Sequence, residues 1–529
     1  MDPRSSRRSW WPETGVFLGI WLMLMIAGRS RLLRDPGTFW HTVVGQHILA
    51  TGDLIRTDPF SFTRRGAPWL SRQWLSEVAM ALIHRIAGLD GLLLATVTIL
   101  AGLYAWVAHR LIRRGIHVLL TALVVTLAMA ASSFHFHIRP HLTSIVLLGW
   151  TFARLCDFEA GRIPLVRLFW LVPLFVVWTN AHDGVVGGLA TLTLTTTGWA
   201  LAWPIRRAGP LARGRGLLVL GLLVLACWLT VLINPFGLEL PRTWFQLLRS
   251  PVLPEVIDEH GPLLARPYGV MVLPMGLLFV AAFAGILPRP RVTWCIPLVW
   301  LALTFSRIRH GPLFAITAVL ALGEMLPHVR WAAWLARSGS VLFRLRDPDR
   351  VVGRGGFDLR PTLLPALLVL TALTLQVLAV QVPVLGRGWA RLDPTHWPTG
   401  LLPELRGIER DRPAGTPVFN EMLFGGFLIY ATPHLWVFID DRCELYGDRM
   451  LLDYARAERA EPARLEQWAR DYGFELALTR PGSGFDRYLS RAPRWRLVRR
   501  TDAAALYRRP VEHPRGRPSG GGTVPSASP

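Results

Sequence analysis

The sequence contains no lysine. All 58 of its basic residues are arginine, against 36 acidic residues, so the 529-residue chain carries a formal net charge of +22. A basic chain of this size would usually suggest a nucleic-acid partner. Selection for phosphate binding rarely removes lysine altogether, however, and a genome-wide codon bias towards arginine explains the absence more simply. We therefore expect no nucleic-acid partner, and the positions of the arginines matter more than their number.

Cysteine is also scarce. The four cysteines form no CxxC pair and no His/Cys cluster, and they are Cys156, Cys227, Cys295 and Cys443. This spacing suggests neither a zinc site nor a disulfide framework. The first three lie in or beside apolar stretches, where a free cysteine behaves as a small buried hydrophobic residue.

Long apolar runs are abundant. Hydrophobic residues make up 51% of the chain, and the mean hydropathy is +0.34. Eleven runs are long enough to span about 30 Å of hydrocarbon, and they cover residues 15–32, 89–109, 116–134, 141–156, 164–180, 184–204, 216–233, 268–287, 292–306, 311–327 and 362–383. Arginines precede the first run, as in a signal peptide, but no small-residue cleavage site follows it. We interpret it as an uncleaved helix.

The distribution of arginine predicts the sidedness of these helices. With the N-terminus in the cytoplasm and eleven crossings, the cytoplasmic segments carry 22 arginines and the outer loops carry 13. This difference agrees with the positive-inside rule. Counting the amphipathic segment 74–88, which contains Glu77, as a further crossing would reverse every later loop. We therefore interpret it as a helix lying at the outer interface.

Unusual polar residues concentrate in the loops that this topology places outside. They lie in residues 34–63, 134–141, 178–184, 233–241, 254–262 and 306–312. Ionisable groups at the ends of membrane helices indicate function by default. We expect these segments to meet and to outline a polar cavity at the outer leaflet.

Each of these segments also has a structural interpretation. The spacing of His135, His137 and His141 resembles a pair of metal ligands, but no clear third ligand accompanies them, so we predict no metal site. Asn180 and His182 have a second interpretation, as caps of the helices on either side. Each residue alone is more often structural, whereas the confinement of the whole set to one face favours a site.

The first outer loop is the most informative of these segments. Asp35 directly follows the first apolar run, and residues 38–52 predict a short interfacial helix that stops at Gly52. A carboxylate beside a helix N-terminus stays ionised, which suits a base or metal ligand that faces a charged lipid head group. Pro36 at the next position equally fits Asp35 as an N-cap, so both interpretations stay open.

Motifs along nearly the whole chain form a specific set. They are FWHTVVGQHILATGDLIRTDPFS (39–61), PWLSRQWLSE (68–77), WTNAHDG (178–184), SRIRHGPLFAI (306–316) and GGFLIYATPHLWVFIDDRCELYG (425–447). Together they resemble an uncharacterised family of bacterial multi-pass membrane proteins. The first hundred residues also resemble the GT-C membrane glycosyltransferases, especially the protein mannosyltransferases and the lipid A aminoarabinose transferases.

The resemblance implies a mainly α fold, in which residues 1–384 form a polytopic, GT-C-like bundle in the bacterial inner membrane. It implies transfer of a sugar from a polyprenyl-phosphate donor to an acceptor outside the cytoplasm. Asp35 matches the catalytic aspartate, which acts as a general base or as a ligand to a divalent cation such as Mg²⁺ or Mn²⁺. Asp53 and Asp58 match acidic positions that shape the site. Many GT-C members have a second acid where this chain has Pro36, so a metal requirement stays open.

A lipid-phosphate leaving group needs fixed cations, and guanidinium groups match phosphate bidentately. The outer helix ends supply Arg139, Arg307 and Arg309, together with His310. The candidate substrate-binding residues are Asp53, Asp58, Arg72, Glu77, Arg139, His141, Asn180, His182, Arg307, Arg309, His310, Asp440 and Arg442.

Residues 385–510 predict a soluble α/β domain on the outer side, because hydropathy drops after the last apolar run. Strands and helices alternate in it. The pattern is a strand, a glycine turn and an apolar segment in 417–431, a buried strand in 436–442, a helix in 449–472, a strand in 474–479 and a hairpin in 495–509. Residues 511–529 are rich in Gly, Ser and Pro, so we expect them to be disordered.

Charged residues follow the buried strand of this domain: Asp440, Asp441, Arg442 and Glu444. The carboxyl ends of strands are where α/β sheets usually bind ligands. We expect the domain to hold the acceptor there. A salt-bridged loop that packs against the membrane domain is an equal alternative.

Two other functions remain open. A transporter or lipid flippase would have charges buried mid-helix and helices broken at the bilayer centre, whereas the polar residues of this chain cluster at the outer helix ends. A non-catalytic assembly protein for surface polysaccharide would use the outer domain to bind a partner. Loss of Asp35 would then be harmless.

Overall fold

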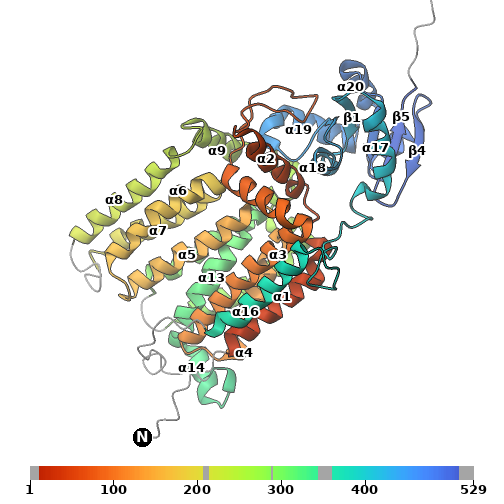
Figure 1. Ribbon diagram of the computed structural model, residues 1–529. Helices are drawn as coiled ribbons and strands as arrows, with labels where there is room; N and C mark the ends of the chain where they lie inside the picture. Colours follow the sequence, from red (N-terminus) through yellow and green to blue (C-terminus); the bar gives the residue numbers. More distant parts are fainter. Residues whose placement is uncertain (1–10, 206–213, 287–289, 344–359, 511–529) are drawn as a thin grey trace, which may run out of the picture.

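The computed structural model describes residues 11–205, 214–286, 290–343 and 360–510. A bundle of long helices makes up most of it, and a smaller region of strands and short helices lies at one end of the bundle (Figure 1). The tail 511–529, which we expected to be disordered, lies outside the described residues.

Every apolar run found in the sequence is helical over most of its described length. The helices are α1 (Trp11–Arg31), α3 (Trp74–Arg113), α4 (Val118–Ser132), α5 (His141–Glu159), α6 (Leu171–Ala181), α7 (Val185–Ala202), α8 (Arg215–Leu229), α11 (Leu273–Ala284), α12 (Val292–Ser306), α13 (Gly311–Met325) and α16 (Arg360–Val377). Within the described residues, seven helical segments are long and apolar enough to cross a membrane. The chain is therefore a multi-pass membrane protein. The count of eleven crossings and the orientation stay predictions.

Shorter helices connect these long ones. They are α2 (Gly37–Thr51), α9 (Glu239–Arg249), α10 (Leu253–Val256) and α14 (Arg330–Arg337), with single turns at η6 (Asp258–His260) and η9 (Ile308–His310). The predicted interfacial segment 74–88 is the first part of α3. Ala87 and Gly88 leave helical geometry, and Gly88 has a φ of 60°, which glycine adopts at little cost. The helix therefore bends at the junction that the sequence suggested.

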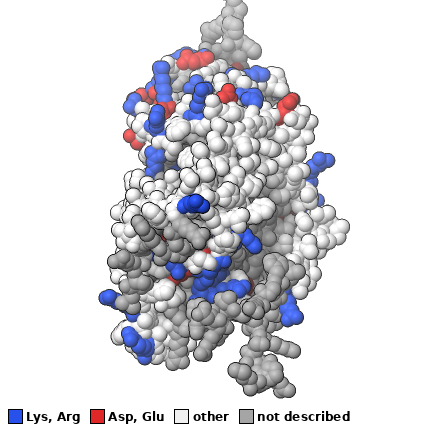
Figure 2. Space-filling model, turned by 90° about the vertical axis from the view of Figure 1, so that its left-hand side faces the viewer, with Lys and Arg blue, Asp and Glu red and all other residues white. Residues whose placement is uncertain are grey.

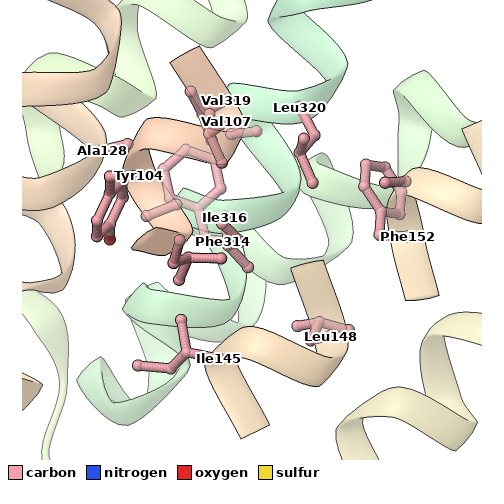
Figure 3. Close-up of a cluster of buried hydrophobic side chains, with 14 of the residues drawn as sticks. Tyr104, Val107, Ala128, Ile145, Leu148, Phe152, Phe314, Ile316, Val319 and Leu320 are labelled. Carbon is pink, nitrogen blue, oxygen red and sulfur yellow. The ribbon is translucent and has the colours of Figure 1, made fainter. Parts of the chain in front are cut away.

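Helix α13 lies at the centre of the bundle. Every one of its residues except Leu313 is buried, as expected of a helix that is apolar on all sides. Figure 3 shows part of the core, in which Phe314 and Ile316 lie among side chains of α3, α4 and α5 that include Tyr104 and Phe152. The central position of α13 brings the loop before it, which contains Arg309, to the middle of one end of the bundle.

An ion-pair cluster holds the opposite end of the bundle together. Asp157 of α5 and Glu324 of α13, whose side chains are 8% and 6% exposed, pair with five arginines: Arg110, Arg114, Arg154, Arg162 and Arg291. On the face shown in Figure 2, charged side chains of both signs gather in the upper part, a second and mainly basic group lies in the lower half, and the surface between the two groups is mostly uncharged. This distribution is typical of a protein that crosses a membrane.

The C-terminal region (Leu402–Arg508) contains a mixed five-stranded sheet in the order β2-β1-β3-β5-β4. β1 pairs in parallel with β2 and β3, whereas β5 pairs antiparallel with β3 and β4. The strands are β1 (Thr416–Asn420), β2 (Leu435–Val437), β3 (Leu476–Thr479), β4 (Arg496–Arg500) and β5 (Ala505–Arg508), and the helices are α17 (Leu402–Asp411), α18 (Met422–Ala431), α19 (Cys443–Arg459), α20 (Arg464–Tyr472) and α21 (Gly484–Leu489). The domain boundary at 384 stays a prediction.

Gly425 and Gly426 do not form the predicted glycine turn, because both lie inside α18. A Cβ at Gly425 would lie 2.3 Å from the carbonyl oxygen of Ile439, and one at Gly426 would lie 2.3 Å from that of Pro36. Glycine permits turns, and it also permits the close approach of two backbones. In α18 the two glycines permit close approach. The helix thereby packs directly on the loop that carries Asp35.

Candidate functional site

Four breaks between helices meet at one end of the bundle (Figure 1). Asp35 follows α1, Arg139 precedes α5, His182 lies between α6 and α7, and Arg309 lies between α12 and α13. Burial lowers the pKa of His182 to about 3, and the nearby charges of Arg309, Arg139 and Arg72 contribute to this shift. Four of the six loops that we expected to meet therefore lie close together, and the polar cavity that we expected them to outline stays a prediction.

Asp35 uses both of its carboxylate oxygens. Oδ1 accepts a hydrogen bond from the backbone N–H of Gly37 at 2.7 Å, and Oδ2 accepts one from Nη1 of Arg139 at 3.0 Å. The first bond satisfies the N–H group of the first residue of α2. Pro36 is at the N-cap position of this helix, so the prediction of Asp35 as the N-cap was one position off. The second bond adds a charge-assisted contact to Arg139.

Arg139 joins Asp35 to a second carboxylate, Asp441, which comes from the C-terminal region. Nη2 of Arg139 lies 3.7 Å from Oδ2 of Asp441. Oδ1 of Asp441 accepts a hydrogen bond from Nε1 of Trp40 at 2.7 Å. Oδ2 is buried and accepts no hydrogen bond from the residues that the structure describes. We call Asp35, Arg139 and Asp441 the carboxylate–arginine bridge.

One carboxyl group of the bridge, that of Asp441, has a pKa near neutral pH. Burial raises the pKa of Asp441 to about 7, and the negative charges of Asp35 and Asp440 add to the rise, whereas Arg139 opposes it. Burial works against the charge of Arg139, but Asp35 and Asp441 outweigh it and raise the pKa of the guanidinium group. A carboxyl group that titrates near neutral pH beside a permanent cation is suited to proton transfer.

A buried ion network fastens the first loop to the C-terminal region. Arg442 donates to Asp58 at 2.8 Å and to Asp440 at 2.6 Å, and all three side chains are 0% exposed. The hydroxyl of Tyr446 donates to Asp440 at 2.9 Å, and the guanidinium group lies 4.6 Å from the ring centre of Trp69. In the structure, Asp58, Asp440 and Arg442 therefore hold the loop in place. Substrate binding by these three residues stays a prediction.

Arg72 forms a second link between the same parts. It pairs with Asp183, between α6 and α7, and with Glu444 of α19 at 2.8 Å. Nε1 of Trp69 donates to Glu444 at 2.9 Å, and Nε1 of Trp244 donates to Asp183 at 2.7 Å. Burial disfavours the charge of Arg72, but Asp183 and Glu444 outweigh it and raise the pKa of its guanidinium group. Arg72 therefore stays charged and joins the first loop to both the bundle and the C-terminal region.

Three other predicted residues are engaged with side chains or backbone of the bundle. Glu77 pairs with His41 at 2.8 Å, and each side chain is 1% exposed. Asn180 accepts a hydrogen bond from Nε1 of Trp74 at 2.9 Å. Nδ1 of His182 accepts one from the backbone N–H two residues further on, also at 2.9 Å, which agrees with the capping interpretation.

A second polar group lies beside the bridge. Nδ1 of His135 lies 3.8 Å from Glu259 of η6, and Nε2 of His141 donates to the backbone carbonyl of His135. Arg309 donates to Nε2 of His260. Burial by itself would raise the pKa of Glu259, but the neighbouring basic side chains outweigh it and lower that pKa. Glu259 and Arg309 thus add one charge of each sign close to Arg139.

The remaining predicted residues form none of the hydrogen bonds or ion pairs that hold the bridge together in the described part of the chain. Asp53 is exposed beyond the far end of α2, a 15-residue helix that extends for roughly 22 Å. Arg307 is half-buried and contributes to the electrostatic surroundings of His260. Nδ1 of His310 donates to the carbonyl oxygen of Leu303 at 3.1 Å.

Asp441 belongs to the charged run after β2 where we expected the acceptor, but only Asp440 and Arg442 of this run were named as candidate substrate-binding residues. Asp440 and Asp441 are neighbours in this run, which lies in the loop between β2 and α19, and they have different partners. Asp440 bonds to Arg442, whereas Asp441 lies against Arg139 and Trp40. The charged run was visible in the sequence, but which of its two aspartates faces the bundle was not.

The arrangement of the acids does not fit a divalent cation. Among the described residues, no group of three or more His, Cys, Asp or Glu side chains is arranged to hold a metal ion. The two carboxylates of the bridge instead flank the guanidinium group of Arg139, which supplies the positive charge between them. The mechanism proposed below therefore uses protein groups alone.

No family model and no curated protein sequence matches this chain. The crystal structure of ArnT from Cupriavidus metallidurans bound to undecaprenyl phosphate aligns with 93% of this chain and 97% of its own, with a TM-score of 0.49 and 16% sequence identity. The apo structure of ArnT from the same organism aligns over the same shares, with a TM-score of 0.48 and 16% identity. The similarity to ArnT thus extends over nearly the whole chain.

Proposed function

We propose that this protein is a membrane glycosyltransferase that moves a sugar from a polyprenyl-phosphate donor to an acceptor hydroxyl at the Asp35 end of the bundle. The carboxylate–arginine bridge is the observation that carries this proposal, because Arg139 lies 3.0 Å from Asp35 and 3.7 Å from Asp441. The bridge is located where the membrane helices end and the C-terminal region begins. A lipid-linked donor approaches this place along the bundle, and a water-soluble acceptor approaches it from the other side.

In the proposed reaction, the acceptor oxygen forms a bond to the anomeric carbon of the sugar while the bond from that carbon to the phosphate oxygen breaks. The hydroxyl proton passes to a carboxylate, and the bonding electrons leave with the polyprenyl phosphate. A positioned base contributes about 10²- to 10⁴-fold to such a step. Arg139 and Arg309 stabilise the charge that develops on the phosphate, since fixed guanidinium groups match its oxygens.

Asp441 has the oxygen that is available for the proton. Both oxygens of Asp35 accept hydrogen bonds, from Gly37 and Arg139, whereas Oδ2 of Asp441 accepts none from the described part of the chain. The pKa of Asp441, raised by burial to about 7, lets it exchange a proton near neutral pH. We therefore assign proton transfer to Asp441 and the positioning of Arg139 to Asp35. The family resemblance had assigned the base to Asp35.

A transfer assay tests these roles. The purified protein is incubated with polyprenyl-phosphate sugars extracted from bacterial membranes and with extracted envelope glycans as acceptors. Asp441→Asn still accepts the hydrogen bond of Trp40 but takes no proton, so we expect transfer to fall about 100-fold with donor binding retained. Asp35→Asn should weaken donor binding as well, because Arg139 is no longer held. Asp411→Asn, an exposed position in α17, is the matched control and should keep the wild-type rate.

The outcomes separate the alternatives. Equal transfer by the wild type and both bridge variants would remove the bridge from the mechanism and favour a non-catalytic assembly protein. A wild type that binds no polyprenyl-phosphate sugar, measured by competition with undecaprenyl phosphate, would overturn the proposal. Complete loss of transfer in Asp35→Asn at every pH, with only slower transfer in Asp441→Asn, would make Asp35 the base.

A further inference from the structure

A hollow of about 620 Å³ lies in the C-terminal region, away from the bridge. It is formed by the last turn of α19, by α20, and by α21 with the chain that follows it. Five arginines line it, and we call them the arginine groove: Arg459, Arg470, Arg487, Arg491 and Arg494.

The arginine content of the groove exceeds what the composition of the chain explains. Arginine accounts for 58 of all 529 residues but for five of the eleven residues that line the groove. A codon bias acts on the whole chain, so it does not produce a local concentration of this size. Glu466 is the one acid in this lining, and its carboxylate already accepts a hydrogen bond from Nε1 of Trp495 at 2.7 Å.

Three of these arginines are free to bind a ligand. Arg470, Arg491 and Arg494 are exposed and form no ion pair with any residue that the structure describes. Two other exposed arginines of this region, Arg499 and Arg500 of β4, each pair with an acid and lie outside the groove. A concave surface lined by one sign of charge attracts ions of the opposite sign. The groove is therefore suited to an anion.

The groove lies on the aqueous side of the C-terminal region. Helix α20 is at the end of this region that is far from the bundle (Figure 1). α19 begins at Cys443, two residues after Asp441, and leaves helical geometry at Gly447. Its continuous part then runs from residue 448 to Arg459 at the groove and extends for roughly 18 Å. A donor lipid held in the membrane does not reach this surface, so the occupant comes from the solvent.

We propose that the arginine groove binds the acidic part of an extended acceptor, a saccharide chain that carries carboxylate or phosphate groups. Guanidinium pairs bidentately with either group. The inference rests on the proposed function, because the same saccharide chain presents its reacting hydroxyl to Asp441 at the other end of α19. Because the arginine groove and Asp441 are separated, an acceptor that reaches both must contain several sugar units.

Binding measurements on the full-length protein in detergent test the groove without any transfer reaction. The probes are fluorescent oligogalacturonate for carboxylates, a phosphorylated oligomannoside for phosphates, a neutral maltooligosaccharide and inorganic phosphate. We expect at least one acidic saccharide to bind in a salt-dependent manner, and the neutral one not to bind. The variant Arg470→Gln/Arg491→Gln/Arg494→Gln should bind the acidic saccharide about tenfold more weakly, which corresponds to about 1.4 kcal/mol.

A charge-matched control decides whether the groove itself is responsible. The variant Arg406→Gln/Arg410→Gln/Arg496→Gln removes the same charge from three exposed positions outside the groove and should bind like the wild type. Equal weakening by both triple variants would show a general charge effect and overturn the proposal. Binding of the neutral saccharide as tightly as the acidic ones would overturn it too, as would inorganic phosphate that binds as tightly as the saccharides.

The two proposals fail in different ways. In one case, only the groove variant loses binding of the acidic saccharide, and the wild type shows no transfer. This result would support the saccharide-binding groove and overturn the proposed transferase activity. In the other case, Asp441→Asn shows reduced transfer, but the wild type binds no acidic saccharide. This result would support the transferase activity and overturn the proposed groove. Because all six positions are exposed, we expect both triple variants to fold. Thermal melting checks this.

Discussion

Gly426 of α18 packs so closely on Pro36 that a Cβ at position 426 would lie 2.3 Å from the Pro36 carbonyl oxygen. The atom that such a Cβ would meet belongs to the backbone, so no flexible side chain can move aside for it. Pro36 directly follows Asp35, so the contact fixes the distance between the C-terminal region and the first outer loop. Asp441 reaches Arg139 only if that distance is kept.

Gly426→Ala should therefore reduce transfer about tenfold and lower the melting temperature, because overpacking of this kind typically costs about 1–3 kcal/mol. A transfer assay and thermal melting in detergent measure the two effects. Gly407→Ala in α17 is the control, since a Cβ there meets no atom within 4 Å. Alanine favours a helix by about 1 kcal/mol over glycine, so this control should be as stable as the wild type or more so. Wild-type behaviour of Gly426→Ala would show that the contact is not needed.

The pH dependence of stability should change in Asp441→Asn. Burial raises the pKa of Asp441 to about 7 in the folded protein, whereas the unfolded chain releases this proton near pH 4. Between these values the folded state binds more protons than the unfolded state, so this group makes the wild type less stable as pH rises. Asparagine does not titrate, and the variant should lack this slope. Melting curves from about pH 4.5 to about 8 compare the two, and identical slopes would contradict the raised pKa.

Transfer should rise with pH and level off above about 7, because only the ionised form of Asp441 accepts the acceptor proton. The pH profile of kcat/KM measures this, and Asp411→Asn should reproduce the wild-type profile. In Asp441→Asn the residual activity should no longer depend on this ionisation. A wild-type rate that stays constant between about pH 5 and about 8 would assign proton transfer to another group.

Arg442→Gln should destabilise the junction between the first loop and the C-terminal region. It leaves Asp58 and Asp440 buried without their cation, and removing one partner of a buried ion pair costs about 3–5 kcal/mol. We expect a lower melting temperature and faster proteolysis of residues 52–72. Arg410→Gln, at an exposed position, should change neither. An unchanged proteolysis pattern in Arg442→Gln would show that other contacts hold the loop.

The helices could be predicted from the sequence because apolar runs and helix ends are local patterns. Most of the C-terminal strands were predicted for the same reason, since alternation and buried apolar runs are visible over a few residues. Three helices were not predicted, α17, α18 and α21, and the single helix predicted over 449–472 is divided into α19 and α20. The glycines of α18 are explained by two neighbours distant in the chain, Pro36 and Ile439, and a local pattern does not show such contacts.

The candidate site was predictable only in part. Topology indicated that the loops with Asp35, Arg139, His182 and Arg309 share one face, because each lies at the same end of a membrane helix. The pairing within the site depends on contacts over long distances in the sequence: Arg139 is 104 positions from Asp35. The packing of the C-terminal region on the bundle determines which residues pair in the site. Residues close in the sequence do not determine it.

The bridge also has a consequence for the order of synthesis. Trp40 and Asp441, which bond to each other, are 401 positions apart. In a chain still on the ribosome, the membrane helices that flank Asp35 and Arg139 can insert long before Asp441 has been translated. Under the proposed mechanism, an incomplete chain has Asp35 and Arg139 but lacks Asp441, so it is inactive. Transfer would begin only after the C-terminal region has been synthesised and has packed on the membrane helices.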